Sequence, residues 1–408
     1  MKRIETMTIV TLITLLASFS IVVIGCASYD STATEERSES DADSDADSDA
    51  DSDADSDTNT DGGVVALPCD IMEDAGAPCV SAHSTARVLR TGYTGPLYQL
   101  CRGTAVTGPD SCQGDAMDIE AVDGYADATA HEEFCGKDVC TITVVYDQAE
   151  HDPEVGPNND LEPAPLGGAW GFPDKPVNAS DLPVIVNGHN AYGMMFRPGM
   201  GYRAGCDGCK FGVGTDLATG DTAQTIYMVT SSNGLNNGCC FDYGNAETTC
   251  NNDHNGTMEA IYFGGGVIWG TGNGSAPWVM ADLEDGLYAG WENNQDQEIS
   301  TNKTLTSEFV TGILVGDTED KNDGKGRFAL YAADANEGEL TEMYDGIRPE
   351  REGYVPMQKQ GSLILGIGGD NSVGASGYFY EAAIVNAALD RDTLDELQAA
   401  IVSANFRN

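Results

Sequence analysis

The chain contains many short apolar segments separated by turn-forming residues, and this pattern limits the fold more than any other feature. From residue 140 onward, strand-like runs alternate with Gly, Asn and Asp, and the 408 residues include 49 glycines. Many short strands with frequent turn signals predict an all-β fold of the β-sandwich type. The predicted strands are 140–146, 225–230, 259–263, 277–284, 309–315, 327–331, 362–367 and 377–385.

Two short helices are expected beside the strands. One would follow Ser81, over residues 82–89. The other lies near the C-terminus, where Asp390 is a candidate cap for a stretch with Leu394, Leu397 and Ile401 on one face. No domain boundary is evident after residue 63, so we expect one folded domain over 64–408.

Residues 1–25 have the composition of an export signal. Lys2 and Arg3 precede an apolar run over 7–24, which ends in Val-Ile-Gly before Cys26. The last four residues resemble a bacterial lipoprotein box, which predicts cleavage before Cys26 and a lipid on its sulfur. An uncleaved signal anchor is the alternative, because 18 apolar-leaning residues just reach the length of a membrane span. In both cases we expect an exported protein tethered to a membrane, at the cell surface or as an outer-membrane lipoprotein.

The segment 26–63 is expected to be a disordered acidic linker. Its Asp-Ser-Asp-Ala repeats contain almost no apolar residue, so no core offsets the entropy lost on ordering. Residues 35–61 hold 13 acids and one base, and the whole chain has a formal net charge of -46. The folded part is therefore acidic as well. Nucleic acid is excluded as a partner, because phosphate binding requires a positive surface.

The cysteines predict disulfide bridges, which are favoured in an exported chain. Eleven cysteines remain besides Cys26, and this odd number leaves one thiol over, for which Cys250 is the candidate. Cys206 and Cys209 have the spacing of a metal site too, but no second such pair or His cluster accompanies them, so we expect no metal and no cofactor. The spacings favour four local bridges: Cys69–Cys79, Cys101–Cys112, Cys135–Cys140 and Cys206–Cys209.

Cys239 and Cys240 are adjacent in the sequence. Consecutive Cα atoms lie ~3.8 Å apart, closer than the ~4.4–6.8 Å usual across a disulfide. A bond between them would close a small, rigid ring. From the residues alone, two separate distant partners are the favoured interpretation.

Two stretches carry candidate catalytic carboxyl groups. Strand alternation over 278–284 places Asp282 and Glu284 on one face with Trp278 and Met280, an arrangement that suits a sugar-binding cleft; a solvated outer face is the alternative.

In the second stretch, an apolar strand runs into Gly368-Gly369 and then Asp370; a simple strand-exit turn is the alternative. Retaining glycoside hydrolysis uses two carboxyl groups ~5–5.5 Å apart, but composition alone does not select Glu284 and Asp370.

Residues 68–406 resemble the catalytic domain of glycoside hydrolase family 54, the retaining α-L-arabinofuranosidases best known from filamentous fungi. The longest matching stretch is Cys-Cys-Phe-Asp-Tyr-Gly-Asn-Ala-Glu-Thr at 239–248. The resemblance implies a β-sandwich of the concanavalin-like jelly-roll kind. The other matching stretches are 68–71, 82–85, 97–100, 258–262, 277–278 and 364–372.

The resemblance also implies residue roles. Glu284 corresponds to the nucleophile and Asp370 to the acid/base. The pair Cys239–Cys240 corresponds to a disulfide between neighbours that lines the sugar subsite, and Cys69–Cys79 and Cys135–Cys140 correspond to the family's other bridges. Asp282, Trp269 and Gly369 correspond to sugar-contacting positions.

Asp285 and Gly286 depart from the family pattern, because they stand where the family has two Asn. We expect both in the substrate-binding region, with altered hydroxyl contacts. The family's β-trefoil module is not expected here.

The implied function is exo-acting removal of terminal arabinofuranosyl units from arabinose-containing plant polysaccharides by a monomer. The alternatives are a non-catalytic surface protein that binds arabinan or arabinoxylan, and a related β-xylosidase or galactofuranosidase.

Overall fold

The computed structural model describes residues 66–103, 106–151, 159–165, 172–210, 212, 215–266, 269–291 and 297–408. These ranges belong to one compact unit, Gly62–Asn408. The expected signal segment, the expected linker and Cys26, the expected site of a lipid, lie outside the described residues. No helix in the described ranges is both long and apolar enough to cross a membrane.

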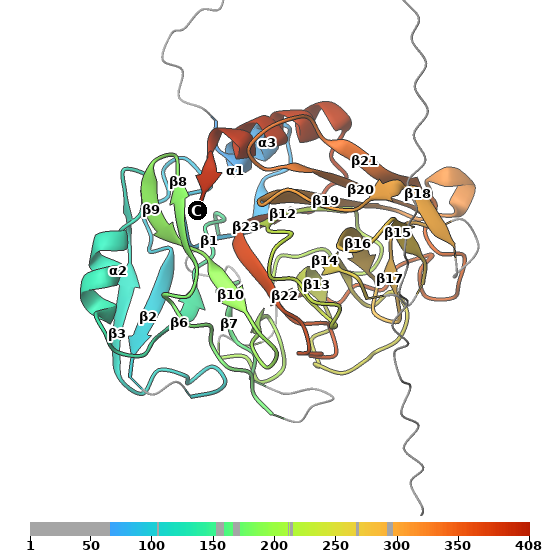
Figure 1. The fold of residues 1–408 in the computed structure, drawn as a ribbon. Coiled ribbons are helices and arrows are strands. Elements are labelled where there is room, and N and C mark those ends of the chain that lie inside the picture. Colours follow the sequence, from blue (N-terminus) through green and yellow to red (C-terminus); the bar gives the residue numbers. More distant parts are fainter. Residues whose placement is uncertain are drawn as a thin grey trace, which may run out of the picture. The chain divides into compact units, whose positions relative to one another are not determined.

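Two seven-stranded sheets dominate the fold, and all strand pairs in them are antiparallel (Figure 1). The first has the order β1 (Cys79–Ser84), β23 (Gly377–Val385), β12 (Gln224–Thr230), β19 (Val310–Asp317), β20 (Arg327–Asp334) and β21 (Thr341–Gly346), with β10 (Met194–Phe196) also paired to β23. The second has the order β17 (Leu287–Tyr288), β16 (Trp278–Asp282), β14 (Glu259–Gly264), β13 (Asp242–Ala246), β22 (Ser362–Leu365), β11 (Tyr202–Ala204) and β7 (Glu162–Pro163).

The two sheets pack against each other and bury the main core between them. β14 and β16 of the second sheet contact β19 and β20 of the first. Ile226 and Leu314 of the first sheet belong to the same buried cluster as Phe263 of the second. The contact is close enough that a Cβ atom on Gly312 would overlap the Phe263 ring. Apolar side chains that alternate along the strands therefore produce the layered core.

A second core lies on the other face of the first sheet. The helix α3 (Arg391–Ser403) packs with α1 (Pro68–Asp74), as Figure 1 shows. Leu394, Leu397 and Ile401 of α3 form a buried cluster with Tyr227 and Ile313 of the sheet.

Smaller elements complete the unit. They are α2 (Ala128–Cys135), the 3-10 turn η2 (Asn322–Gly324), and the strands β2 (Tyr98–Arg102), β3 (Asp115–Ile119), β4 (Ala121–Val122), β5 (Tyr125–Ala126), β6 (Cys140–Val145), β8 (Pro183–Val186), β9 (His189–Tyr192), β15 (Thr271–Asn273), β18 (Glu298–Lys303) and β24 (Phe406–Arg407). β15 and β18 pair in parallel.

The structure confirms a mostly β fold with antiparallel sheets and the C-terminal helix, whose cap Asp390 accepts a hydrogen bond from the Thr393 N–H at 3.0 Å. The expected helix over 82–89 is wrong. Residues 79–84 form β1, because they pair with β23 and all but one of their side chains are buried. The Ser84 hydroxyl then accepts hydrogen bonds from the N–H groups of Ala86 and Arg87 and turns the chain.

Five disulfides are present in the described residues. Cys239 bonds to Cys240, so the interpretation with two distant partners is wrong. Cys250 is buried, has no disulfide partner in the described part of the chain, and lies against the Cys206–Cys209 bridge. The other bonds are Cys69–Cys79, Cys101–Cys112 and Cys135–Cys140.

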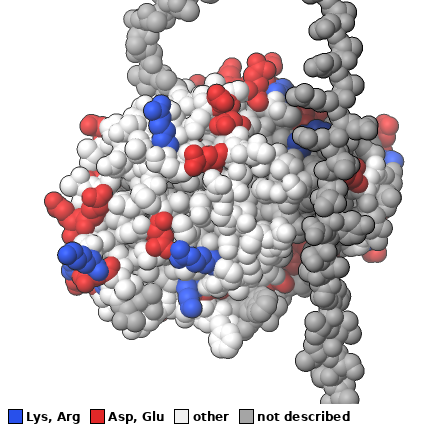
Figure 2. Space-filling view, viewed as in Figure 1, with Lys and Arg blue, Asp and Glu red and all other residues white. Residues whose placement is uncertain are grey.

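The surface agrees with the acidic composition. On the face in Figure 2, basic side chains lie dispersed among acidic and uncharged residues. This face offers no continuous positive area for a phosphate backbone.

Candidate active site

Glu284 lies in a tight turn directly after β16. The strand ends at Asp282, and the Leu283 N–H donates to the Gly286 carbonyl at 3.1 Å. The expected strand over 277–284 is therefore too long, and strand alternation does not position Glu284. Its φ of 79° is uncommon for a residue with a side chain, and its N–H donates to Asp282 Oδ1 at 3.1 Å. The turn thus fixes the backbones of two acids relative to each other.

Asp370 lies in a second turn, which follows β22. The Asn371 N–H donates to the Gly368 carbonyl at 2.9 Å, and the Gly368 N–H donates to the Ser372 carbonyl at 3.1 Å. Asp370 Oδ1 accepts hydrogen bonds from the Ser372 N–H at 2.9 Å and from the Ser372 hydroxyl. Its carboxyl group is half-buried and held by its own turn.

The two turns meet at Gly369. A Cβ atom on this residue would lie 2.6 Å from Glu284 Oε2 and would overlap Glu247 Oε2. Only glycine therefore lets these carboxyl groups approach the backbone beside Asp370. The charge of Asp370 is one of the causes that raise the pKa of Glu284, which agrees with their proximity.

A buried arginine supports the Asp370 turn. Arg203 on β11 is fully buried, and its Nη2 donates to the Gly369 carbonyl at 2.5 Å. Asn371 Nδ2 donates to Asp174 Oδ2 at 3.1 Å. Burial raises the pKa of Asp174 to about 8, although the hydrogen bond from Asn371 and the charge of Arg203 partly oppose this rise.

Three buried carboxyl groups and one half-buried carboxyl group, that of Glu284, form a cluster next to Asp370, which we call the acid cluster: Asp242, Glu247, Asp282 and Glu284. Burial raises the pKa of Glu284 above its usual range, with further contributions from a hydrogen bond and the charge of Glu247. Burial raises the pKa of Asp282 to about 8, although hydrogen bonds from Asp242 and the Glu284 backbone oppose this. Burial and the nearby Asp282 raise the pKa of Asp242 well above its usual range. Like charges this close do not all ionise, so the cluster keeps protons near neutral pH.

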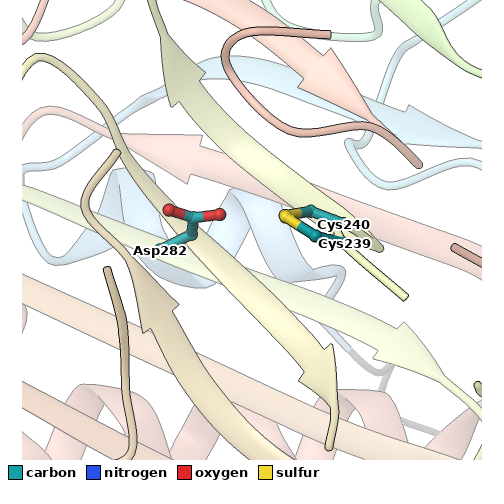
Figure 3. Close-up of side chains that lie close together, drawn as sticks. All are labelled: Cys239, Cys240 and Asp282. Atoms are coloured by element: carbon teal, nitrogen blue, oxygen red, sulfur yellow. A yellow bond between two sulfur atoms is a disulfide. The ribbon is translucent and has the colours of Figure 1, made fainter. Parts of the chain in front are cut away.

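The bridge between Cys239 and Cys240 faces this cluster. The Asp282 carboxylate points toward the two sulfurs (Figure 3), and the three ligand-type atoms lie within 4.8 Å of one another. Bonded sulfurs are not thiolates, so the group lacks the Cys ligands of a zinc site. It instead combines an apolar disulfide surface with a hydrogen-bond acceptor.

Trp269 and the 283–286 turn make contact. The Trp269 Nε1–H donates to the Asp285 carbonyl, and a Cβ atom on Gly286 would overlap the indole ring. The Asp285 side chain accepts a hydrogen bond from Asn252 Nδ2 at 2.6 Å. The Arg351 guanidinium lies 3.6 Å from the centre of a Trp269 ring, which is a cation–π contact.

Two expected cleft residues are not on a cleft. Trp278 is only 5% exposed and its Nε1–H donates to the Asn273 carbonyl at 3.3 Å, and Met280 is fully buried. Both faces of β16 are therefore covered, since all of its residues are buried and the strand contacts β20 of the first sheet.

The sequence interpretation missed Asp242, Glu247, Arg203 and Arg351. For the first two a signal was available, since both acids lie in the stretch 239–248 that resembles the family, with Asp242 on β13 and Glu247 directly after it. Arg203 and Arg351 carry no local signal of this kind, because their partners are distant in the sequence.

A two-sheet β protein with paired, partly buried carboxyl groups next to an aromatic ring is typical of sugar-cleaving β-sandwich proteins. The family model "Alpha-L-arabinofuranosidase B, catalytic" matches residues 68–407. The chain belongs to this family.

Curated relatives are fungal proteins. The chain is 41% identical over 348 residues to "Probable alpha-L-arabinofuranosidase B" of Aspergillus terreus. The matched stretch covers 84% of this chain and 63% of the relative. It is 40% identical over 348 residues to "Arabinofuranosidase/B-xylosidase" of Trichoderma koningii, with the same coverage of 84% and 63%. The chain thus spans less than two thirds of the length of these relatives.

Solved structures show the same similarity. A GH54 α-L-arabinofuranosidase soaked with a cyclic sulfate inhibitor matches with a TM-score of 0.73 and 38% identity, over 84% of this chain and 66% of that one. An arabinofuranosidase complexed with arabinofuranosyl-α-1,2-xylobiose matches with a TM-score of 0.72 and 38% identity, over 83% and 65%.

Proposed function

We propose that this protein is a retaining, exo-acting α-L-arabinofuranosidase that removes terminal arabinofuranosyl units from arabinose-containing plant polysaccharides, and that it works as a monomer. The observation that carries the proposal is the convergence of Glu284 and Asp370 at Gly369. Family membership and the relatives' names support it. We also propose that the two packed sheets form the family's concanavalin-like jelly roll.

The proposed reaction has two steps. The Glu284 carboxylate attacks the anomeric carbon, and the glycosidic C–O bond breaks while protonated Asp370 donates its proton to the leaving oxygen. Asp370, now a carboxylate, then takes a proton from water. The resulting hydroxide equivalent attacks the anomeric carbon of the glycosyl ester, which releases arabinose and restores both carboxyl groups to their starting states.

The sugar would be bound by the groups around this pair. Asp282 is proposed to accept a hydrogen bond from a ring hydroxyl, and the Cys239–Cys240 bridge to pack on an apolar face of the sugar. Trp269 would supply a further apolar wall, with Gly369 admitting the ring close to the backbone. Asp285 and Gly286 are proposed to change hydroxyl contacts relative to the family's Asn pair.

Two substitutions test the catalytic assignment with an aryl α-L-arabinofuranoside. Glu284→Gln removes the nucleophile and should abolish turnover, whereas Glu133→Gln, at an exposed position, should leave it unchanged. Asp370→Asn should reduce hydrolysis of substrates with poor leaving groups more than of substrates with good ones. Near wild-type activity of Glu284→Gln, or equal damage to both substrate types by Asp370→Asn, would show that the assignment is wrong.

A shifted sugar preference is the second candidate function. The name of the Trichoderma koningii relative includes β-xylosidase activity, which supports this candidate. A panel of nitrophenyl arabinofuranoside, β-xyloside and galactofuranoside substrates decides between them. A non-catalytic arabinan- or arabinoxylan-binding protein would instead show binding in isothermal titration with no hydrolysis of any panel member.

We further propose that residues 1–25 are a lipoprotein-type signal peptide, that 26–63 form a spacer, and that Cys26 carries a lipid that tethers the domain 64–408 outside the cell. The proposal of a lipid anchor rests on the sequence alone. The relatives named above are fungal and give no support for a bacterial-type lipoprotein. Metabolic labelling with an alkyne fatty acid should mark the wild-type protein and not Cys26→Ser. Equal labelling of both would exclude Cys26 as the attachment site.

A further inference from the structure

Glu247 is a buried acid for which the proposed reaction has no use. It follows β13 and is fully buried, and its Oε2 has no hydrogen-bond partner among the described residues other than the neighbouring Glu284 carboxyl group. That oxygen lies beside Gly369 on the side where Glu284 Oε2 also lies. An unpaired carboxylate at this position would be costly, because it would be both desolvated and next to another acid.

The surroundings of Thr257 indicate where a proton is. Thr257 Oγ1 lies 2.6 Å from Glu247 Oε1 and 2.7 Å from the His254 carbonyl oxygen. A hydroxyl has one proton to donate, and a carbonyl oxygen only accepts. If Glu247 were ionised, one of these two short contacts would have no proton. Both are hydrogen bonds when Glu247 Oε1 carries a proton and donates it to Thr257, which then donates to His254.

We propose that Glu247 is a neutral carboxylic acid in the working enzyme and acts as a positioning residue, whose proton is held by Thr257 so that Glu284 can carry the negative charge of the pair. This inference rests on the proposed function, because it assigns Glu284 as the nucleophile. The other ionisable groups that face this pair are Asp242, Asp282 and Asp370, and Arg203 donates to the Gly369 carbonyl.

Glu247→Gln and Thr257→Val have different expected effects on the pH profile. Gln is neutral and nearly isosteric, so Glu247→Gln should keep kcat within about threefold and leave the acid limb of kcat/KM in place, because it replaces one neutral group by another beside Glu284. Thr257→Val removes the acceptor that holds the proton on Glu247. A hydrogen bond is worth about 1 kcal/mol, which predicts a shift of the acid limb to higher pH by about 0.7 unit, and Thr257→Ser should restore it.

The proton can also be observed without activity. With ¹³C-labelled glutamate side chains at pH 7, wild type should show a protonated carboxyl signal that disappears in Glu247→Gln and persists in Glu284→Gln. Burial raises the pKa of Glu162 to about 7, so Glu162→Gln serves to identify its signal. Near-wild-type circular dichroism establishes that each variant is folded.

The outcomes separate the two proposals. A loss of kcat in Glu247→Gln as large as in Glu284→Gln, or a protonated signal unchanged by Glu247→Gln, would overturn the inference about Glu247. A wild-type protein that hydrolyses no member of the glycoside panel would overturn the proposed function, and the ¹³C spectrum would still decide the protonation of Glu247.

Discussion

Asp174→Asn should make the folded protein less sensitive to alkaline pH. Asp174 is buried beneath the 368–372 turn, and burial raises its pKa from 3.8 to about 8. A carboxyl group whose pKa is raised by folding contributes its full stability below the unfolded pKa and loses it as pH rises through the folded pKa. The protein should therefore lose stability between pH 4 and pH 8 through this residue.

The magnitude follows from the two pKa values. With 3.8 unfolded and about 8 folded, linkage gives a destabilisation of about 1.7 kcal/mol at pH 5 and about 5 kcal/mol at pH 8. Asn keeps a polar partner for Asn371 but does not titrate. The difference in unfolding free energy between Asp174→Asn and wild type should thus increase by roughly 3.5 kcal/mol between these pH values.

Urea denaturation at pH 5 and pH 8, followed by tryptophan fluorescence, measures this difference. Asp138→Asn is the matched control, because Asp138 is exposed, and its pH dependence should equal that of wild type. If Asp174→Asn and wild type lose stability in parallel between pH 5 and pH 8, Asp174 does not titrate in this range and the argument from burial is refuted.

Three further outcomes are expected. Arg203→Met removes a charged hydrogen bond to Gly369 worth about 1.5–3 kcal/mol, so kcat on an aryl arabinofuranoside should fall by about 10- to 100-fold, with partial recovery in Arg203→Lys. The double variant Cys239→Ala/Cys240→Ala should raise KM about tenfold in steady-state kinetics, because it removes roughly 50 Å² of apolar contact. Arg87→Met leaves the fully buried Glu381 without its two-point ion pair and should lower the unfolding free energy by about 3–5 kcal/mol in urea titrations, and Glu381→Leu in the same chain should restore most of it.

The strands could be predicted from the sequence because their signals are local. Apolar runs bounded by Gly, Asn and Asp marked β12, β14, β19 and β23, and Asp390 marked the start of α3. The segment 82–89 failed because pairing with β23 decides its conformation, and that partner lies about 300 residues away in the chain. The same limit applied to Arg203, whose bond to Gly369 spans 166 residues.

The acid cluster was only half predictable. Asp282 lies on a strand, so alternation identified it, but Glu284 reaches the site through a turn with positive φ that alternation does not describe. The neighbour bond between Cys239 and Cys240 was disfavoured by ordinary disulfide spacing and came only from the family resemblance. Periodicity and spacing rules describe regular strands and ordinary disulfides, so they do not predict a turn with positive φ or a bond between adjacent cysteines.

The hydrogen atom that serves as the side chain of Gly369 sets how near two acids can come to a third. Attempts to redesign which sugar the protein accepts should therefore leave that single position untouched and vary Asp285 and Arg351, whose side chains contact Asn252 and the Trp269 indole. The absence of one methyl group at Gly369 would then mark the position at which engineering is not tolerated.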